Sequence, residues 1–99
     1  MNTTVLQVGV VLFVMGLSAV ILRGQLLAML LGLELMIASV SVLLAYHASL
    51  FNDPAGLAAV VLIIVVSAAE AVIGLCLIIG LHRAGRAPET QDLTELREP

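Results

Sequence analysis

The sequence predicts an all-α membrane protein with three transmembrane helices. Of its 99 residues, 62% are hydrophobic and only 11% are charged, and the mean hydropathy is +1.20. A soluble domain of this size buries too small a fraction of its surface to hide that much apolar area. The apolar residues form long runs without the alternation of strands, and backbone inside a bilayer must be helical or a closed barrel. The runs therefore indicate spanning helices in a single integral membrane domain over residues 1–99.

Short polar breaks divide the apolar sequence into runs that are each long enough to cross a membrane. The third run has 25 residues, of which 15 are Val, Leu or Ile. As a helix it would extend about 37 Å, which is enough for a hydrocarbon core of about 30 Å with some tilt. We expect spans at about residues 5–22, 26–46 and 57–81, followed by a polar tail over residues 82–99.

The two breaks differ in character. Arg23-Gly24-Gln25 is so short that the first two spans must form an antiparallel hairpin, in which Gly9 and Gly16 share a face suited to close helix contact. The second connection is expected over residues 47–56, where Asn52-Asp53-Pro54 is typical of a turn.

The basic residues predict the orientation. Two crossings separate the first loop from the end of the third span, so both lie on one side of the membrane. Basic residues favour the cytoplasmic side. We therefore expect the N-terminus outside and the C-terminus in the cytoplasm, with all four basic residues on the cytoplasmic side: Arg23, Arg83, Arg86 and Arg97.

Two glutamates interrupt the apolar spans near their centres. Glu34 is two residues from the midpoint of the second span, and Glu70 is one residue from the midpoint of the third. A glutamate at that depth costs roughly 3 kcal/mol, which the surrounding aliphatic residues can offset. Intramembrane acids are rare and usually mark ion or proton paths. The pair is therefore the candidate functional site.

Each glutamate belongs to a stripe of small or polar residues at helical spacing. Such stripes mark faces that pack on other helices rather than on lipid. We therefore expect both carboxylates to face protein or trapped water, at depths that match within a few ångströms. The stripes are Glu34, Ala38, Ser41 and Ala45 in the second span, and Ser67, Glu70 and Gly74 in the third.

Two carboxylates suit proton exchange. At a separation of about 10 Å and an effective dielectric of about 20, they would repel by roughly 1.7 kcal/mol, so ionisation of both is disfavoured but reachable. The chain has no Lys, and no Arg lies inside a span. Any neutralising cation must therefore come from another protein. The alternatives are a purely structural role in holding helices together, or coordination of sodium.

Other chemistry has little support. There is no basic patch for nucleic acid. Cys76 is the single cysteine and lies in an apolar run, which favours packing over reactivity. No complete enzyme site and no transition-metal ligand set can be assembled from the sequence. Arg23 is either a marker of topology or a cytoplasmic-side partner for a neighbouring acid.

Three segments together resemble a known family. RGQLLAMLLGLELMI at 23–37, SAAEAVIGLCL at 67–77 and LHR at 81–83 are similar to the subunit K family of proton-pumping NADH:quinone oxidoreductase, respiratory complex I. The mitochondrial counterpart is the 4L subunit. The similarity covers about residues 5–83, and the two glutamate motifs at this spacing are specific only in combination.

The resemblance implies a place in the membrane arm of the complex, within the lipid bilayer of the bacterial inner membrane. The implied neighbours are the membrane components called A, J, N and H, of which H contains the quinone site. Glu34 and Glu70 would match the family's proton-relay glutamates, and Arg23 the basic residue of its cytoplasmic loop. NADH, FMN, iron–sulfur clusters and quinone would belong to partner subunits, with no cofactor or metal site in this chain.

The sequence differs from the family at several positions, and other families offer alternative interpretations. Many family members carry Asn where this chain has Ala38, often another Asn at Ser41, and several have a second basic residue at Gly24. The main alternative is a subunit of a related multisubunit cation/proton antiporter or of a membrane hydrogenase. A rotary-ATPase proteolipid has two spans and one acid, so the third span argues against it. A purely structural scaffold subunit would not need either carboxylate.

Overall fold

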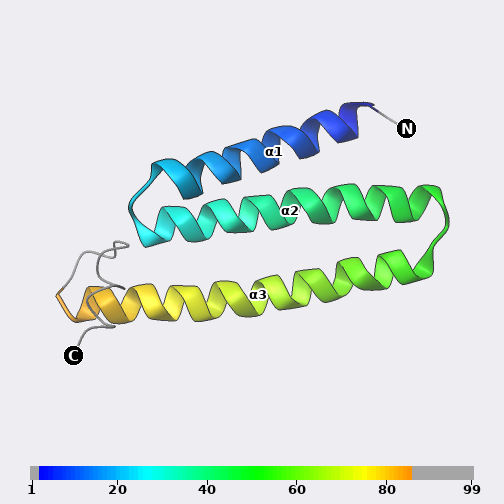
Figure 1. Cartoon of the computed structure of the whole chain (residues 1–99). Helices are drawn as coiled ribbons and strands as arrows, with labels where there is room; N and C mark the ends of the chain where they lie inside the picture. Colours follow the sequence, from blue (N-terminus) through cyan, green and yellow to red (C-terminus); the bar gives the residue numbers. More distant parts are fainter. Residues whose placement is uncertain (1–2, 86–99) are drawn as a thin grey trace.

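The computed structural model describes residues 3–85, which form three α-helices (Figure 1). They are α1 (Thr3–Leu22), α2 (Leu26–Leu50) and α3 (Pro54–Arg83). All three are long and apolar enough to cross a membrane, which confirms the predicted all-helical fold with three helices of spanning length. The predicted tail from residue 86 onward, with Arg86 and Arg97, lies outside the described residues.

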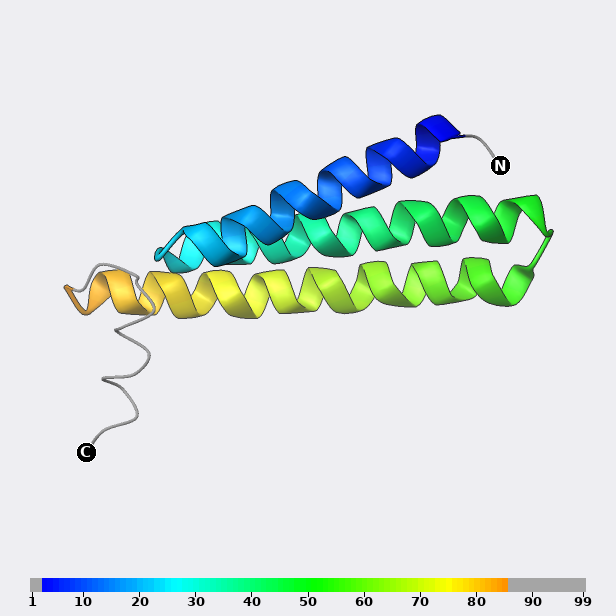
Figure 2. The same ribbon diagram turned by 45° about the horizontal axis from the view of Figure 1, so that its top comes forward.

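The helices lie side by side in one row, with α2 in the middle (Figure 1). α1 packs on one side of α2 and α3 packs on the other, while α1 is inclined to α2 (Figure 2). The described part measures 52 × 25 × 19 Å. Its long axis exceeds a hydrocarbon core of about 30 Å, so the row can span a bilayer lengthwise.

Close backbone approach joins α1 to α2. Gly9, Gly16 and Gly32 are buried, and a Cβ atom added to Gly16 would collide with the carbonyl oxygen of Gly32. The Ser39 hydroxyl donates a hydrogen bond of 2.5 Å to the carbonyl oxygen of Gly9. The face shared by Gly9 and Gly16 is therefore the contact face, as the sequence predicts, because small residues let membrane helices approach closely.

The connection between α2 and α3 is shorter than the expected 47–56 segment. α2 continues to Leu50 and α3 begins at Pro54, so only residues 51–53 remain outside the helices. Asp53 caps α3, since its carboxylate accepts a hydrogen bond of 3.1 Å from the Ala55 N–H. Asn52 has a positive φ of 48°, a conformation that Asn tolerates. Asn52 and Asp53 lie in the turn, as predicted, whereas Pro54 is already the first residue of α3. The helices thus extend further into the polar sequence than the apolar runs do.

The Asp53 cap allows a first test. Asp53→Ala should lower the free energy of unfolding by about 1 kcal/mol, because Ala cannot accept the hydrogen bond at the start of α3. The measurement is the midpoint of SDS-induced unfolding of the purified chain, followed by circular dichroism. Asp53→Asn retains an acceptor and should stay close to the original chain. An equal loss in both variants would contradict the capping role.

Most large apolar side chains lie on the outside of the row. Within residues 3–85, the buried hydrophobic side chains are few, whereas many Val, Leu and Ile side chains are exposed along all three helices. Such a surface is typical of a chain covered by lipid or by other subunits. The buried hydrophobic residues are Leu26, Ala48, Val60 and Leu81.

Candidate functional site

Glu34 lies on the face of α2 that packs against α3. Its side chain is half-buried, and its Oε2 accepts a hydrogen bond of 2.5 Å from the Ser67 hydroxyl on α3. Further along the same stripe, Ser41 is buried and Ala45 is half-buried. The predicted stripe of α2 therefore turns toward α3 at Glu34 and Ser41, whereas Ala38 of the same stripe is exposed.

A hollow of about 270 Å³ surrounds the Glu34 carboxylate at this interface. Its wall is mixed, with two hydroxyl groups and the carboxylate among apolar side chains. The hydroxyl groups of Ser41 and Ser67 give the carboxylate polar neighbours within this hollow. The lining residues are Glu34, Ile37, Ala38, Ser41, Ile64, Ser67 and Ala68.

Glu70 lies one helical turn beyond Ser67 on α3, at the edge of the α2–α3 interface. Ser67 and Gly74 face α2, where Gly74 lies against Leu30, but the Glu70 side chain is exposed on the surface of the chain. A spacing of three residues rotates Glu70 by about 60° from Ser67 around the helix axis. Within residues 3–85, no hydrogen bond or ion pair involves the Glu70 carboxylate.

A second hollow, of about 310 Å³, contains Glu70. Ile37 and Ser67 line both hollows and therefore form part of the wall between them. On α3, the other residues of the two hollows lie on opposite sides of Ser67, so the hollows occupy opposite flanks of the α2–α3 interface. The second hollow is lined by Ile37, Leu62, Ile63, Val66, Ser67 and Glu70.

The two carboxylates lie at similar levels along the helices. Glu34 is level with Ser67, to which it is hydrogen-bonded, and Glu70 follows Ser67 by three residues. That spacing is about 4.5 Å along the axis of α3. The structure therefore brings the two predicted glutamates to the same interface and within about one turn of each other.

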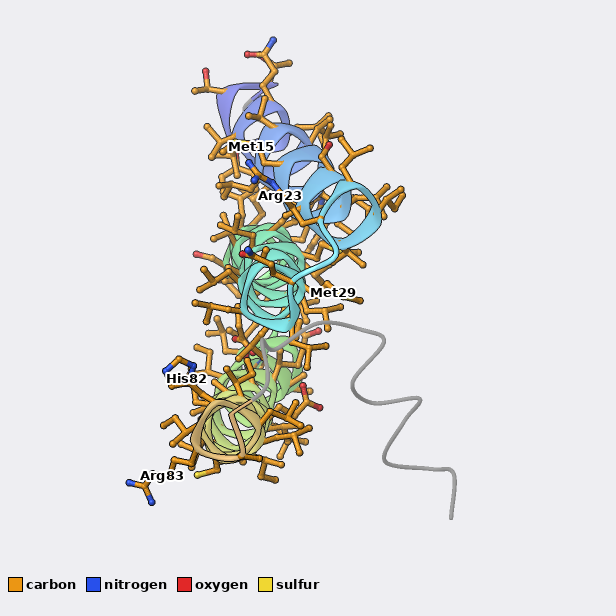
Figure 3. All side chains as sticks on the ribbon, turned by 90° about the vertical axis from the view of Figure 1, so that its left-hand side faces the viewer. Met15, Arg23, Met29, His82 and Arg83 are labelled. Atoms are coloured by element: carbon orange, nitrogen blue, oxygen red, sulfur yellow. The ribbon has the colours of Figure 1, made fainter. Side chains whose placement is uncertain are left out.

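Arg23 lies far from both glutamates. It is exposed in the connection between α1 and α2, at the end of the row that also carries His82 and Arg83 (Figure 3). Eleven residues separate Arg23 from Glu34, which is about 16 Å along a helix. The structure thus does not place Arg23 with the carboxylates, although it does place Arg23 and Arg83 at the same end, as the predicted topology requires.

Ser67 is the site residue whose role the sequence did not reveal. The stripe of α3 identified it as a small residue on a packing face, but its hydrogen-bond partner lies on another helix, 33 residues earlier in the chain. Within the described segment, no three His, Cys, Asp or Glu side chains come together as a group of metal ligands.

Comparison with known proteins shows which family this chain belongs to. Residues 4–98 match the family model described as NADH-ubiquinone/plastoquinone oxidoreductase chain 4L. The chain belongs to this 4L family. A relative from Sulfurihydrogenibium sp. (strain YO3AOP1), described as NADH-quinone oxidoreductase subunit K, is 38% identical over 86 residues, which are 87% of this chain and 86% of the relative.

Membership of the 4L family confirms the resemblance seen in the sequence. It identifies the chain as a membrane subunit of the K type of complex I, and its three apolar helices agree with a multi-pass membrane protein. The match also favours this family over the antiporter and hydrogenase subunits considered above.

Proposed function

We propose that Glu34 and Glu70 relay protons in this subunit during proton translocation coupled to NADH:quinone oxidoreduction. The supporting observation is that both carboxylates lie in adjoining hollows at one helix interface, about one turn apart along α3. Carboxylates can take up and release protons, and intramembrane acids with this placement are typical of proton relays. Arg23 would act at the cytoplasmic end, away from the relay itself.

The exposed side of Glu70 is proposed to face a partner subunit. A carboxylate against lipid is costly, and the chain has no Lys to neutralise it. Arg83 is the last residue of α3, thirteen positions or about 20 Å along the helix from Glu70, and is too far to do so. A neighbouring component of the membrane arm, among A, J, N and H, would cover this flank and supply polar or cationic groups. NADH, FMN, iron–sulfur clusters and quinone would be held by partner subunits.

The proposed orientation places the N-terminus outside and the end with Arg23 and Arg83 in the cytoplasm of a bacterial cell, with α1, α2 and α3 in the inner membrane. Cysteine labelling tests it in a chain that carries Cys76→Ser. Phe51→Cys should react with a membrane-impermeant maleimide in right-side-out vesicles, and Ala84→Cys only in inverted vesicles, because Phe51 and Ala84 lie at opposite ends of α3. The reverse pattern would contradict the orientation.

Glu34→Gln tests the relay at its hydrogen-bonded carboxylate. Gln has nearly the same shape but cannot carry an exchangeable acidic proton, so proton transfer coupled to NADH oxidation should fall. We expect a partial loss, since Glu70 remains at the same interface. The measurement is the proton-to-electron ratio in inverted membrane vesicles. Normal ratios in Glu34→Gln, in Glu70→Gln and in the double variant would instead indicate a structural scaffold.

An antiporter or hydrogenase subunit is distinguished by its neighbours. Purification of the tagged chain in mild detergent should recover subunits that carry flavin and iron–sulfur clusters, together with NADH:quinone reductase activity. Recovery of antiporter or hydrogenase subunits without that activity would overturn the assignment to complex I.

A further inference from the structure

The three described serines that donate through their hydroxyl groups do so in different ways. Ser18 donates to the Val14 carbonyl of its own helix, one turn earlier. This local bond is the usual way for a membrane helix to satisfy a hydroxyl group. Ser39 donates across to α1, and Ser67 donates across to the Glu34 carboxylate on α2. Among these three, Ser67 is the serine whose acceptor is an ionisable side chain.

The surroundings of the bond favour a specific role over general packing. Ser67 is half-buried in the wall between the two hollows, next to Ile37. A hydroxyl hydrogen bond to a carboxylate is charge-assisted and is stronger than one between neutral groups. In a weakly polar environment, such a bond fixes the orientation of the carboxylate and occupies one of its two oxygen atoms.

We infer that Ser67 is a positioning residue for Glu34. Its hydroxyl group holds the carboxylate at the α2–α3 interface and sets how readily Glu34 accepts a proton. The inference builds on the proposed relay by adding the residue that regulates one of its two carriers. Of the titratable side chains in residues 3–85, Glu70 lines the adjoining hollow. α1 packs on the opposite side of α2 and carries no titratable side chain.

Carbodiimide labelling of the assembled complex tests the inference. Dicyclohexylcarbodiimide enters membranes and reacts with protonated carboxyl groups, so its rate of attachment to Glu34 reports the protonated fraction. The labelled peptides of the subunit are quantified by mass spectrometry over a range of pH. Three variants are compared with the original chain. Ser67→Ala removes the hydroxyl group, Ser67→Thr retains it, and Ser39→Ala removes a hydroxyl group that bonds on the other side of α2.

Ser67→Ala should label at Glu34 about three- to tenfold faster at pH values where the original carboxylate is mostly ionised. Its labelling should also extend to higher pH. Ser67→Thr and Ser39→Ala should follow the original profile. The inference is overturned if Ser67→Ala does not differ from the original chain at any pH, whether both are labelled alike or neither is labelled. The inference is also overturned if the pH profile of Glu34 labelling shifts equally in Ser67→Ala and Ser67→Thr, because the loss of the hydroxyl group would then not be the cause.

The proton-to-electron ratio separates this inference from the relay itself. If Ser67 acts through Glu34, Ser67→Ala alone should shift the pH profile of coupled proton transfer. In a chain that already carries Glu34→Gln, adding Ser67→Ala should have no further effect. Normal proton transfer in all glutamate variants, together with faster Glu34 labelling in Ser67→Ala, would refute the relay and retain the positioning role. Conversely, unchanged Glu34 labelling in Ser67→Ala together with impaired proton transfer in Glu34→Gln would refute the positioning role and retain the relay.

Discussion

Glu70→Gln should lower proton transfer coupled to quinone reduction by about tenfold or more, without preventing assembly of the complex. Glu70 lies in the hollow on the flank of the α2–α3 interface opposite to that of Glu34, and no described residue of this chain substitutes for its carboxylate there. The amide has nearly the same size, so the packing around Ile37 and Val66 should persist. The loss should therefore be one of proton exchange rather than of structure.

The measurement combines the rate of NADH:quinone reduction with proton uptake in inverted vesicles, normalised to the amount of assembled complex. Glu70→Asp keeps a carboxylate and should retain a large part of the activity. Cys76→Ala is a matched control on the exposed surface of α3 and should have no effect. A normal proton-to-electron ratio in Glu70→Gln would remove Glu70 from the relay.

Glu70→Gln should have the larger effect of the two glutamate substitutions. The Glu34 carboxylate is already hydrogen-bonded within the chain. When it is replaced, the exposed Glu70 carboxylate remains available to exchange protons with a partner subunit. If Glu34→Gln abolished activity while Glu70→Gln did not, this order would be wrong.

Gly32→Leu should prevent the α1–α2 hairpin from packing and thereby reduce the amount of assembled complex severely. A Cβ atom at Gly32 would lie 2.6 Å from the Gly16 carbonyl oxygen and 3.0 Å from side-chain atoms of Ala19 and Val20. Backbone cannot yield as a flexible side chain does, so the cost should reach the upper end of the range for overpacking, about 3 kcal/mol.

Subunit levels in the membrane and the size of the complex on native gels measure this effect. Gly80→Leu is the matched control, because, apart from the neighbouring residues and backbone of α3 itself, nothing in the described residues lies within 4 Å of a Cβ atom added there. It should leave the α1–α2 hairpin intact, which SDS-induced unfolding of the purified chain can verify. Similar unfolding midpoints for Gly32→Leu and Gly80→Leu would contradict the close contact between α1 and α2.

The sequence was sufficient for the number of helices but not for their ends. Apolar runs report which residues fit the hydrocarbon core, whereas a helix ends where its backbone groups find other partners. α2 therefore continues through residues 47–50, and α3 begins at Pro54 with the Asp53 cap, both beyond the expected spans.

For the candidate site, too, the sequence predicted some features and could not predict others. Helical spacing placed Glu34 and Ser41 on one packing face, and α3 does cover that face. Spacing alone could not show that Glu70 lies at the edge of its stripe, because each residue turns the helix by about 100° and the position of the neighbouring helix decides which side is covered. The bond between Ser67 and Glu34 depends on the axial register of α2 and α3, which no local pattern specifies.

The two interfaces of α2 are held together by different kinds of contact. On one side, the backbones of α1 and α2 approach so closely at Gly16 and Gly32 that neither position has room for a side chain. On the other side, side chains bridge α2 to α3, and longitudinal sliding by a single residue, about 1.5 Å, would stretch the Ser67–Glu34 bond without disturbing the hairpin. A neighbouring subunit that pushed α3 along α2 would therefore act directly on the Glu34 carboxylate, through the hydroxyl group that holds it.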